Sequence, residues 1–198
     1  MMDAYDKIVT WYTEERGKSA IGVPEVRDLL QRLGKGAKIL DVGCGTGIPL
    51  GRYIVQQGGY VLFGIDSSSE MVKVFRENLP DTSVQCASIQ ESDFFSMTFD
   101  AAFSWGVLFH LLPKDQDNAI AKIAAALNEG GYLLFTAGQG QEGERRGVMD
   151  GVEFSYYSLG TEEYRRVLSA HGLTMIDEHF DEGENYYYLA QKIKSSSI

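Results

Sequence analysis

The stretch Ile39-Leu40-Asp41-Val42-Gly43-Cys44-Gly45-Thr46-Gly47 decides what fold this 198-residue chain is expected to have. Residues 39–42 are typical of a buried strand, and the three glycines that follow lead directly into a helical pattern. Glycines in such a turn let the backbone adopt a positive φ and let a ligand approach the main chain without a Cβ in the way. The stretch therefore predicts a ligand-binding turn at the carboxyl end of the first strand of an α/β sheet.

The same alternation of strand and helix continues along the chain. After the first strand, short apolar segments predict strands over residues 60–66, 83–87, 99–104 and 132–137, with helical patterns between most of them. This order indicates βαβ units, a parallel sheet and a doubly wound architecture with helices on both faces. Two further strands, 173–180 and 186–193, are joined by five residues, a connection that permits only an antiparallel hairpin.

The length of the chain favours one domain with a substantial core. We predict four parts: a helical cap over 1–34, a cofactor-binding core over 37–138, a segment over 139–160, and a helix with the final hairpin over 161–198. The segment 139–160 is rich in glycine and charge, and it is long for a connection without regular structure. It is expected to be either a lid over the site or a disordered insert.

Composition narrows the classes of partner. The 18 Lys and Arg residues against 28 Asp and Glu residues give a net charge of -10, which opposes phosphate backbones and anionic lipid surfaces. The two cysteines have no CxxC spacing, the amino terminus lacks the apolar core of a signal peptide, and no apolar run approaches the ~18 residues of a membrane span. We therefore expect a cytoplasmic protein with no nucleic-acid, membrane or metal partner.

Two carboxylates accompany the glycine turn. Asp41 stands beside the turn, where its charge suits an ammonium or sulfonium ligand better than an anion. Asp66 ends the second predicted strand, 23 residues after Gly43, where a carboxylate can accept hydrogen bonds from both hydroxyls of a ribose. The dinucleotide fingerprint would need a glycine at position 48, which is Ile48, so a nicotinamide-dependent oxidoreductase is disfavoured.

With these residues in this order, the chain resembles the class I S-adenosylmethionine-dependent methyltransferases of the small-molecule type. The resemblance runs from the amino-terminal helix with Tyr5 and Tyr12, through Phe99-Asp100-Ala101-Ala102 and Leu127-Asn128-Glu129-Gly130-Gly131, to the final hairpin. It implies a Rossmann-like seven-stranded sheet of order 3-2-1-4-5-7-6 with the last strand antiparallel. It also implies S-adenosyl-L-methionine as cofactor and transfer of its methyl group to a small-molecule acceptor by in-line displacement.

The resemblance also implies roles for individual residues. By this resemblance, the glycine turn lies along the methionine part of the cofactor and Asp66 binds the ribose. Met71 packs on the adenine, and the 88–89 pair lies at the adenine edge. Many relatives carry an aspartate where this chain has Ser88, so a hydrogen bond to adenine loses its charge assistance here. The predicted cofactor-binding residues are Tyr12, Arg16, Asp41, Gly43, Gly45, Gly47, Asp66, Ser67, Met71, Ser88, Ile89 and Ser104.

On the acceptor side, the resemblance puts the segment after the fourth strand at the mouth of the active site. His110 in this segment is the candidate catalytic residue, as a substrate contact or general base, because imidazole titrates near neutral pH. The alternative is a histidine hydrogen-bonded to backbone at the start of a helix. The predicted walls of the acceptor pocket are Trp105, Phe154, Tyr156 and Tyr157, the last three on the supposition that 139–160 closes over the site.

Other functions remain as alternatives. A sensor or accessory protein that binds S-adenosylmethionine or S-adenosylhomocysteine without turnover would need the same nucleoside site. A nucleic-acid methyltransferase is disfavoured by the net charge and by Ser104-Trp105-Gly106-Val107, which stands where an Asn-Pro-Pro-Tyr-like motif would follow the fourth strand. The sequence names neither the acceptor atom nor the oligomeric state.

Overall fold

The computed structural model describes residues 2–140, 142–183 and 185–194. The ends of the predicted domain, residue 1 and residues 195–198, lie outside this description. The helices are α1 (Met2–Gly17), α2 (Val23–Leu30), α3 (Leu50–Gln57), α4 (Ser69–Asn78), α5 (Pro113–Ala126) and α6 (Thr161–Ala170), with short 3-10 helices η1 (Phe94–Ser96) and η2 (Leu108–His110). The strands are β1 (Ala37–Val42), β2 (Tyr60–Asp66), β3 (Ser83–Cys86), β4 (Phe99–Ser104), β5 (Leu127–Ala137), β6 (Gly143–Met149), β7 (Val152–Ser158), β8 (Leu173–Phe180) and β9 (Tyr186–Lys192).

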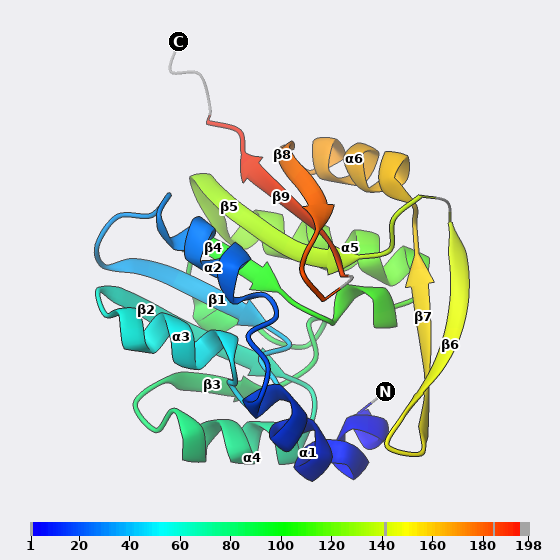
Figure 1. The fold of residues 1–198 in the computed structure, drawn as a ribbon. Coiled ribbons are helices and arrows are strands. Elements are labelled where there is room, and N and C mark those ends of the chain that lie inside the picture. The colour runs from blue at the N-terminus through cyan, green and yellow to red at the C-terminus, as the bar shows by residue number, and fades with distance from the viewer. Residues whose placement is uncertain (1, 141, 184, 195–198) are drawn as a thin grey trace.

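Seven of these strands form one sheet in the order β3-β2-β1-β4-β5-β9-β8 (Figure 1). The first five are parallel to one another, and β9 lies antiparallel between β5 and β8. Because β6 and β7 form a separate pair, β8 and β9 are the sixth and seventh strands of the sheet. The predicted order and the antiparallel last strand are confirmed.

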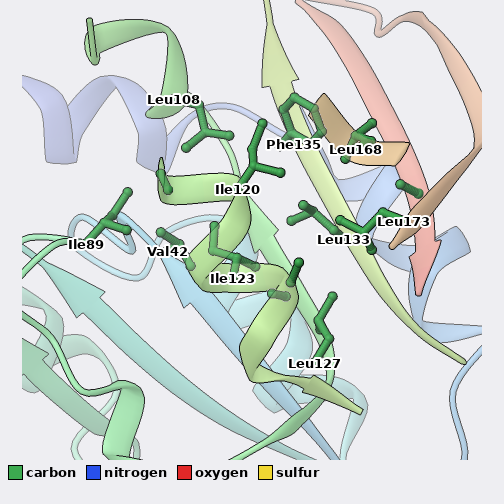
Figure 2. Close-up of a cluster of buried hydrophobic side chains, with 14 of the residues drawn as sticks. Val42, Ile89, Leu108, Ile120, Ile123, Leu127, Leu133, Phe135, Leu168 and Leu173 are labelled. Atoms are coloured by element: carbon green, nitrogen blue, oxygen red, sulfur yellow. The ribbon is translucent and has the colours of Figure 1, made fainter. Parts of the chain in front are cut away.

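Each face of the sheet is covered by its own apolar cluster, because successive side chains of a strand point to opposite faces. Leu40 belongs to the cluster with α5 and α6, whereas its neighbour Ile39 belongs to the cluster with α2, α3 and α4. Figure 2 shows Ile120 and Ile123 of α5 in the first cluster, close to Leu133 of β5. This two-sided burial explains why the parallel strands appear in the sequence as almost continuous apolar runs.

The fifth strand is longer than predicted. It begins at Leu127, which pairs with Phe99, and its register shifts before the regular pairing of Tyr132 with Ala101. Gly130 has a φ of 77°, and a Cβ on Gly131 would lie 2.9 Å from the carbonyl oxygen of Asn128. The two glycines therefore form an irregularity within the strand, in addition to following the end of α5.

The segment 139–160 forms an antiparallel hairpin, so the expectation of a disordered insert is wrong for its described residues. β6 and β7 pair throughout, from Gly143 with Ser158 to Met149 with Val152. β6 is largely exposed, so its sequence lacks the alternation of apolar and polar residues that indicates a strand. In Figure 1 the hairpin stands beside the sheet, and α1 packs between β7 and α4.

None of the helices in the described part of the chain is both long enough and apolar enough to span a membrane.

Candidate active site

The glycine turn after β1 has the conformation that its sequence predicts. Gly43, Gly45 and Gly47 all have positive φ, and the amides of Gly43 and Cys44 donate to the carbonyl oxygen of Ile65 at 2.8 and 2.9 Å. A Cβ on Gly43 would lie 2.2 Å from a methyl carbon of Val107, so this position has no room for a side chain. The turn is thereby fixed against the end of β2.

Asp66 ends β2 directly beside this turn. Its Oδ2 accepts a hydrogen bond from the Gly45 amide, and its Oδ1 accepts one from the Ser68 amide, both at 2.8 Å. Burial raises the pKa of the carboxyl above its usual value, and the backbone amides that bind the carboxylate oppose that rise. A carboxylate has about four acceptor sites, so Asp66 retains acceptor capacity for a ligand hydroxyl.

A cavity of about 340 Å³ opens above the turn and Asp66. This volume lies in the range of small-molecule sites. The cavity is lined by parts of α1, the glycine turn, the start of α4, the loop after β3 and the segment after β4. Its lining residues are Tyr5, Tyr12, Gly43, Gly45, Ile65, Asp66, Ser67, Met71, Ala87, Ser88, Ile89, Gln90, Trp105, Gly106, Val107, His110 and Leu111.

Ten of the predicted site residues line this cavity. They are Tyr12, Gly43, Gly45, Asp66, Ser67, Met71, Ser88, Ile89, Trp105 and His110.

Three further predicted residues, Arg16, Asp41 and Gly47, line a small neighbouring cavity of about 20 Å³. Gly43, Tyr12 and Trp105 border both cavities. The Nε of Arg16 is buried and has no hydrogen-bond partner in the described residues. Burial and the nearby Asp66 carboxylate raise the pKa of Asp41 well above its usual value. The guanidinium of Arg16, whose Nη2 donates to the Ile21 carbonyl at 3.5 Å, and the buried carboxyl of Asp41 therefore border the same small space.

Four predicted site residues lie outside the lining of both cavities. Ser104 is buried, and its hydroxyl donates to the carbonyl oxygen of Val42 at 3.1 Å. The rings of Phe154 and Tyr156 pack against His110, with centroid distances of 5.7 and 4.9 Å. Tyr157 contributes its backbone carbonyl, which accepts from Gln116 Nε2 at 3.0 Å. The hairpin therefore forms a layer behind His110, and the cavity surface itself comes from other elements.

His110 joins three elements at the cavity. Its Nδ1 lies 3.2 Å from the carbonyl oxygen of Ser155 in β7, and its Nε2 lies 2.8 Å from the Tyr5 hydroxyl of α1. Because a carbonyl only accepts, Nδ1 carries the hydrogen, and Nε2 is then the acceptor for the Tyr5 hydroxyl. Burial lowers the pKa of His110 to about 4 and raises that of Tyr5 well above its usual value. Both groups are neutral at pH 7.

Tyr5 and the loop residue Gln90 are the notable lining residues that the predicted set lacks. Tyr5 and Tyr12 are seven positions apart, which puts both on one helix face, and their rings meet edge to face at 5.9 Å. That spacing could have identified Tyr5. A second link fixes the same helix, because the Ser68 hydroxyl at the start of α4 donates to Asp6.

Residues 39–131 match the sequence model of a family described as a methyltransferase domain. Over these residues, the chain is therefore similar to a methyltransferase domain. The matched region begins in β1 and ends in β5, so it contains the glycine turn, Asp66, the loop after β3 and His110. The match agrees with the predicted family over this region.

Curated relatives agree with the methyltransferase domain. An uncharacterized methyltransferase of Bacillus cytotoxicus is 30% identical over 139 residues, which cover 65% of this chain and 63% of the relative. The probable tRNA methyltransferase 9B of Bos taurus is 29% identical over 133 residues, which cover 67% of this chain and 27% of the relative. The chain thus spans less than two thirds of the length of either relative.

Solved structures show the same fold over nearly the whole chain. An amino pentose methyltransferase from Micromonospora echinaspora, solved with S-adenosylmethionine bound, has a TM-score of 0.73 at 19% identity and covers 92% of this chain and 96% of its own. A Burkholderia thailandensis 1,6-didemethyltoxoflavin N1-methyltransferase, solved with S-adenosylhomocysteine, has a TM-score of 0.71 at 22% identity and covers 97% of this chain and 84% of its own. The predicted Rossmann-like methyltransferase fold is confirmed.

Proposed function

We propose that this chain is an S-adenosyl-L-methionine-dependent methyltransferase that acts on a small-molecule acceptor. The observation that carries the proposal is the cavity under α1, which contains both the Asp66 carboxylate beside the glycine turn and the neutral Tyr5–His110 pair. A methyl donor and its acceptor must share one enclosed space, because transfer is fast only when the two reacting atoms are held in line.

The residues present fit the cofactor. Asp66 would accept from the ribose hydroxyls, and Met71, Ser88 and Ile89 would border the adenine. Arg16 and Asp41 lie next to the glycine turn, where a guanidinium would be close to the carboxylate of the methionine part and a carboxylate close to its ammonium group. Two structural neighbours were solved with S-adenosylmethionine or S-adenosylhomocysteine bound, which supports this assignment.

When bound, S-adenosylmethionine supplies a methyl group on a positively charged sulfur. The task of the protein is then to orient the nucleophile and to exclude water. The Tyr5 hydroxyl donates to His110, so its oxygen can accept a hydrogen bond from an N–H or O–H of the acceptor. A pKa of about 4 makes the imidazole of His110 a weak base at neutral pH. We therefore propose that His110 orients the Tyr5 hydroxyl.

A small acceptor suits the surroundings of the cavity. Helix α1 covers it, and the β6–β7 hairpin packs behind His110 through Phe154 and Tyr156. The net charge of -10 disfavours a polyanionic acceptor such as RNA. The structural neighbours named for an amino pentose and for 1,6-didemethyltoxoflavin support a compact acceptor, whereas the relative named for tRNA makes RNA the competing outcome.

The proposal is tested with S-adenosylmethionine carrying a tritiated methyl group, incubated with the protein and either the low-molecular-mass fraction of a cell extract or total RNA. We expect label in the small-molecule fraction, and none when the Asp66→Ala variant replaces the wild-type chain. Label only in RNA would contradict the small acceptor. Binding of the cofactor without transfer to either fraction would favour the non-catalytic sensor.

A further inference from the structure

The loop between β3 and η1 forms one wall of the main cavity but has little regular structure of its own. Ala87, Ser88, Ile89 and Gln90 all line the cavity. Within the loop, the Ser92 amide donates to the Ser88 carbonyl at 2.9 Å. Ser88 also hydrogen-bonds to Glu91 within the loop, and groups outside the loop hold other parts of its main chain.

A strained turn follows the loop immediately. Phe94, Phe95 and Ser96 have φ values of 49°, 59° and 53°, so three consecutive residues with side chains are in the left-handed region. L-residues avoid this region because Cβ approaches a carbonyl oxygen, and such strain persists only when the surrounding structure enforces it. Asp93 provides part of that support by accepting from the Phe95 amide and the Ser96 hydroxyl at 3.0 and 2.8 Å.

Gln85 of β3 also supports this region by hydrogen bonds to Asp93 and Ser92, and Lys122 of α5 contacts its main chain. Its Nζ donates to the backbone carbonyls of Gln90 and Ser92, at 2.9 and 2.5 Å, and lies 5.1 Å from the centre of the Phe94 ring. Ser92 is only 2% exposed, so its carbonyl has little access to water and needs a protein donor. One ammonium group thus contacts both the loop and the strained turn.

From these contacts we infer that Lys122 is a positioning residue for the nucleoside end of the site. Lys122 is not part of the cavity lining; it acts through the two carbonyls, which hold the main chain of Ser88 and Ile89 against the cavity. Only a long side chain with several N–H donors can reach both carbonyls from α5. The inference rests on the proposed function, because it takes the cavity wall at 87–90 to border the adenosine of the cofactor.

The test compares dissociation constants for S-adenosylhomocysteine, and for adenosine as a probe of the nucleoside end, by isothermal titration calorimetry. Lys122→Met keeps the aliphatic stem and removes the donors, and we expect it to weaken binding of both probes by the same factor, about tenfold. Lys122→Arg, which restores donors and charge, is expected to recover most of this loss. Lys114→Met is the matched control, because Lys114 is exposed on the same helix.

Three results would overturn the inference while leaving the proposed function standing. An unchanged dissociation constant in Lys122→Met, together with a lowered melting temperature, would show a role in stability alone. A loss for S-adenosylhomocysteine but not for adenosine would put the effect away from the nucleoside end. If Lys122→Met does not fold, Lys122→Gln, whose shorter side chain cannot reach both carbonyls, must still bind more weakly than the wild type, and equal binding would again contradict the inference. Failure of the wild type itself to bind S-adenosylhomocysteine would instead overturn the proposed function, and this inference with it.

Discussion

At the scale of single residues, His110 shows how its neighbours determine the charge of a side chain. Burial lowers its pKa to about 4, whereas an exposed histidine has a value of about 6.5. Between these pH values the unfolded chain binds a proton that the folded chain does not. The free energy of unfolding must therefore fall as the pH is lowered from 6.5 to 4, by about 3 kcal/mol at most from this residue.

This pH dependence is checked by urea unfolding at several pH values between 4 and 7. Carboxylates also contribute in this range, so the informative quantity is the difference between the wild type and His110→Gln. We expect the variant to lose less stability toward pH 4. His171→Gln is the control. His171 is half-buried, its Nε2 lies 2.7 Å from Asp117 Oδ1, and neither residue lines the cavity. Identical pH profiles for the wild type and His110→Gln would contradict the buried, neutral imidazole.

The sequence correctly predicted the positions of candidate site residues that lie at the ends of strands. Asp66 ends a strand, and its place beside the glycine turn follows from the parallel sheet. The Tyr5–His110 contact joins residues 105 positions apart, and no local pattern specifies it. Ser104 lies at the end of β4 as predicted. Its hydroxyl, however, donates to the Val42 carbonyl, a contact that its position in the sequence does not indicate.

At the scale of elements, the β6–β7 hairpin is attached to the rest of the molecule mainly through β7. Phe154 of β7 is 4% exposed and packs on the Tyr5 ring at a centroid distance of 5.0 Å, whereas Val148 of β6 is 65% exposed. We expect Phe154→Ala to lower the free energy of unfolding by about 3 kcal/mol and to speed amide hydrogen exchange in α1. Val148→Ala should change stability by less than about 0.5 kcal/mol.

Urea unfolding and hydrogen exchange measured by mass spectrometry check both variants of the hairpin. Equal, small effects of Phe154→Ala and Val148→Ala would show that the hairpin does not hold α1 over the cavity.

The elements that the sequence predicted well are those buried on one or both faces. β1, β2 and β4 lie in the middle of the sheet, and their apolar runs identify them. β6 has no buried face, so no periodicity marks it, and its pairing with β7 depends on the turn at 150–151 and on β7 packing against α1 and η2. The start of β5 was missed because Gly130 and Gly131 were expected only to stop a helix.

At the scale of the whole molecule, the sheet order brings the turn after β1, the end of β2 and the segment after β4 to one edge. Ligands of open α/β sheets bind at this edge, outside the carboxyl ends of the strands. In this order β1 pairs with β2 on one side and with β4 on the other. The order was predicted from the family resemblance, since periodicity alone does not specify it. How far α1 and the hairpin close this edge depends on long-range packing that the sequence pattern does not contain.

The most direct test of the central claim, that this cavity holds the adenosyl cofactor, is the thermal unfolding of the wild-type chain with S-adenosylhomocysteine and, separately, with NAD. A ligand that binds only the folded state stabilises it by ~2.7 kcal/mol at 100 times its dissociation constant. We predict a rise in melting temperature with S-adenosylhomocysteine that grows with its concentration, and no rise with NAD. Stabilisation by NAD alone would contradict the account.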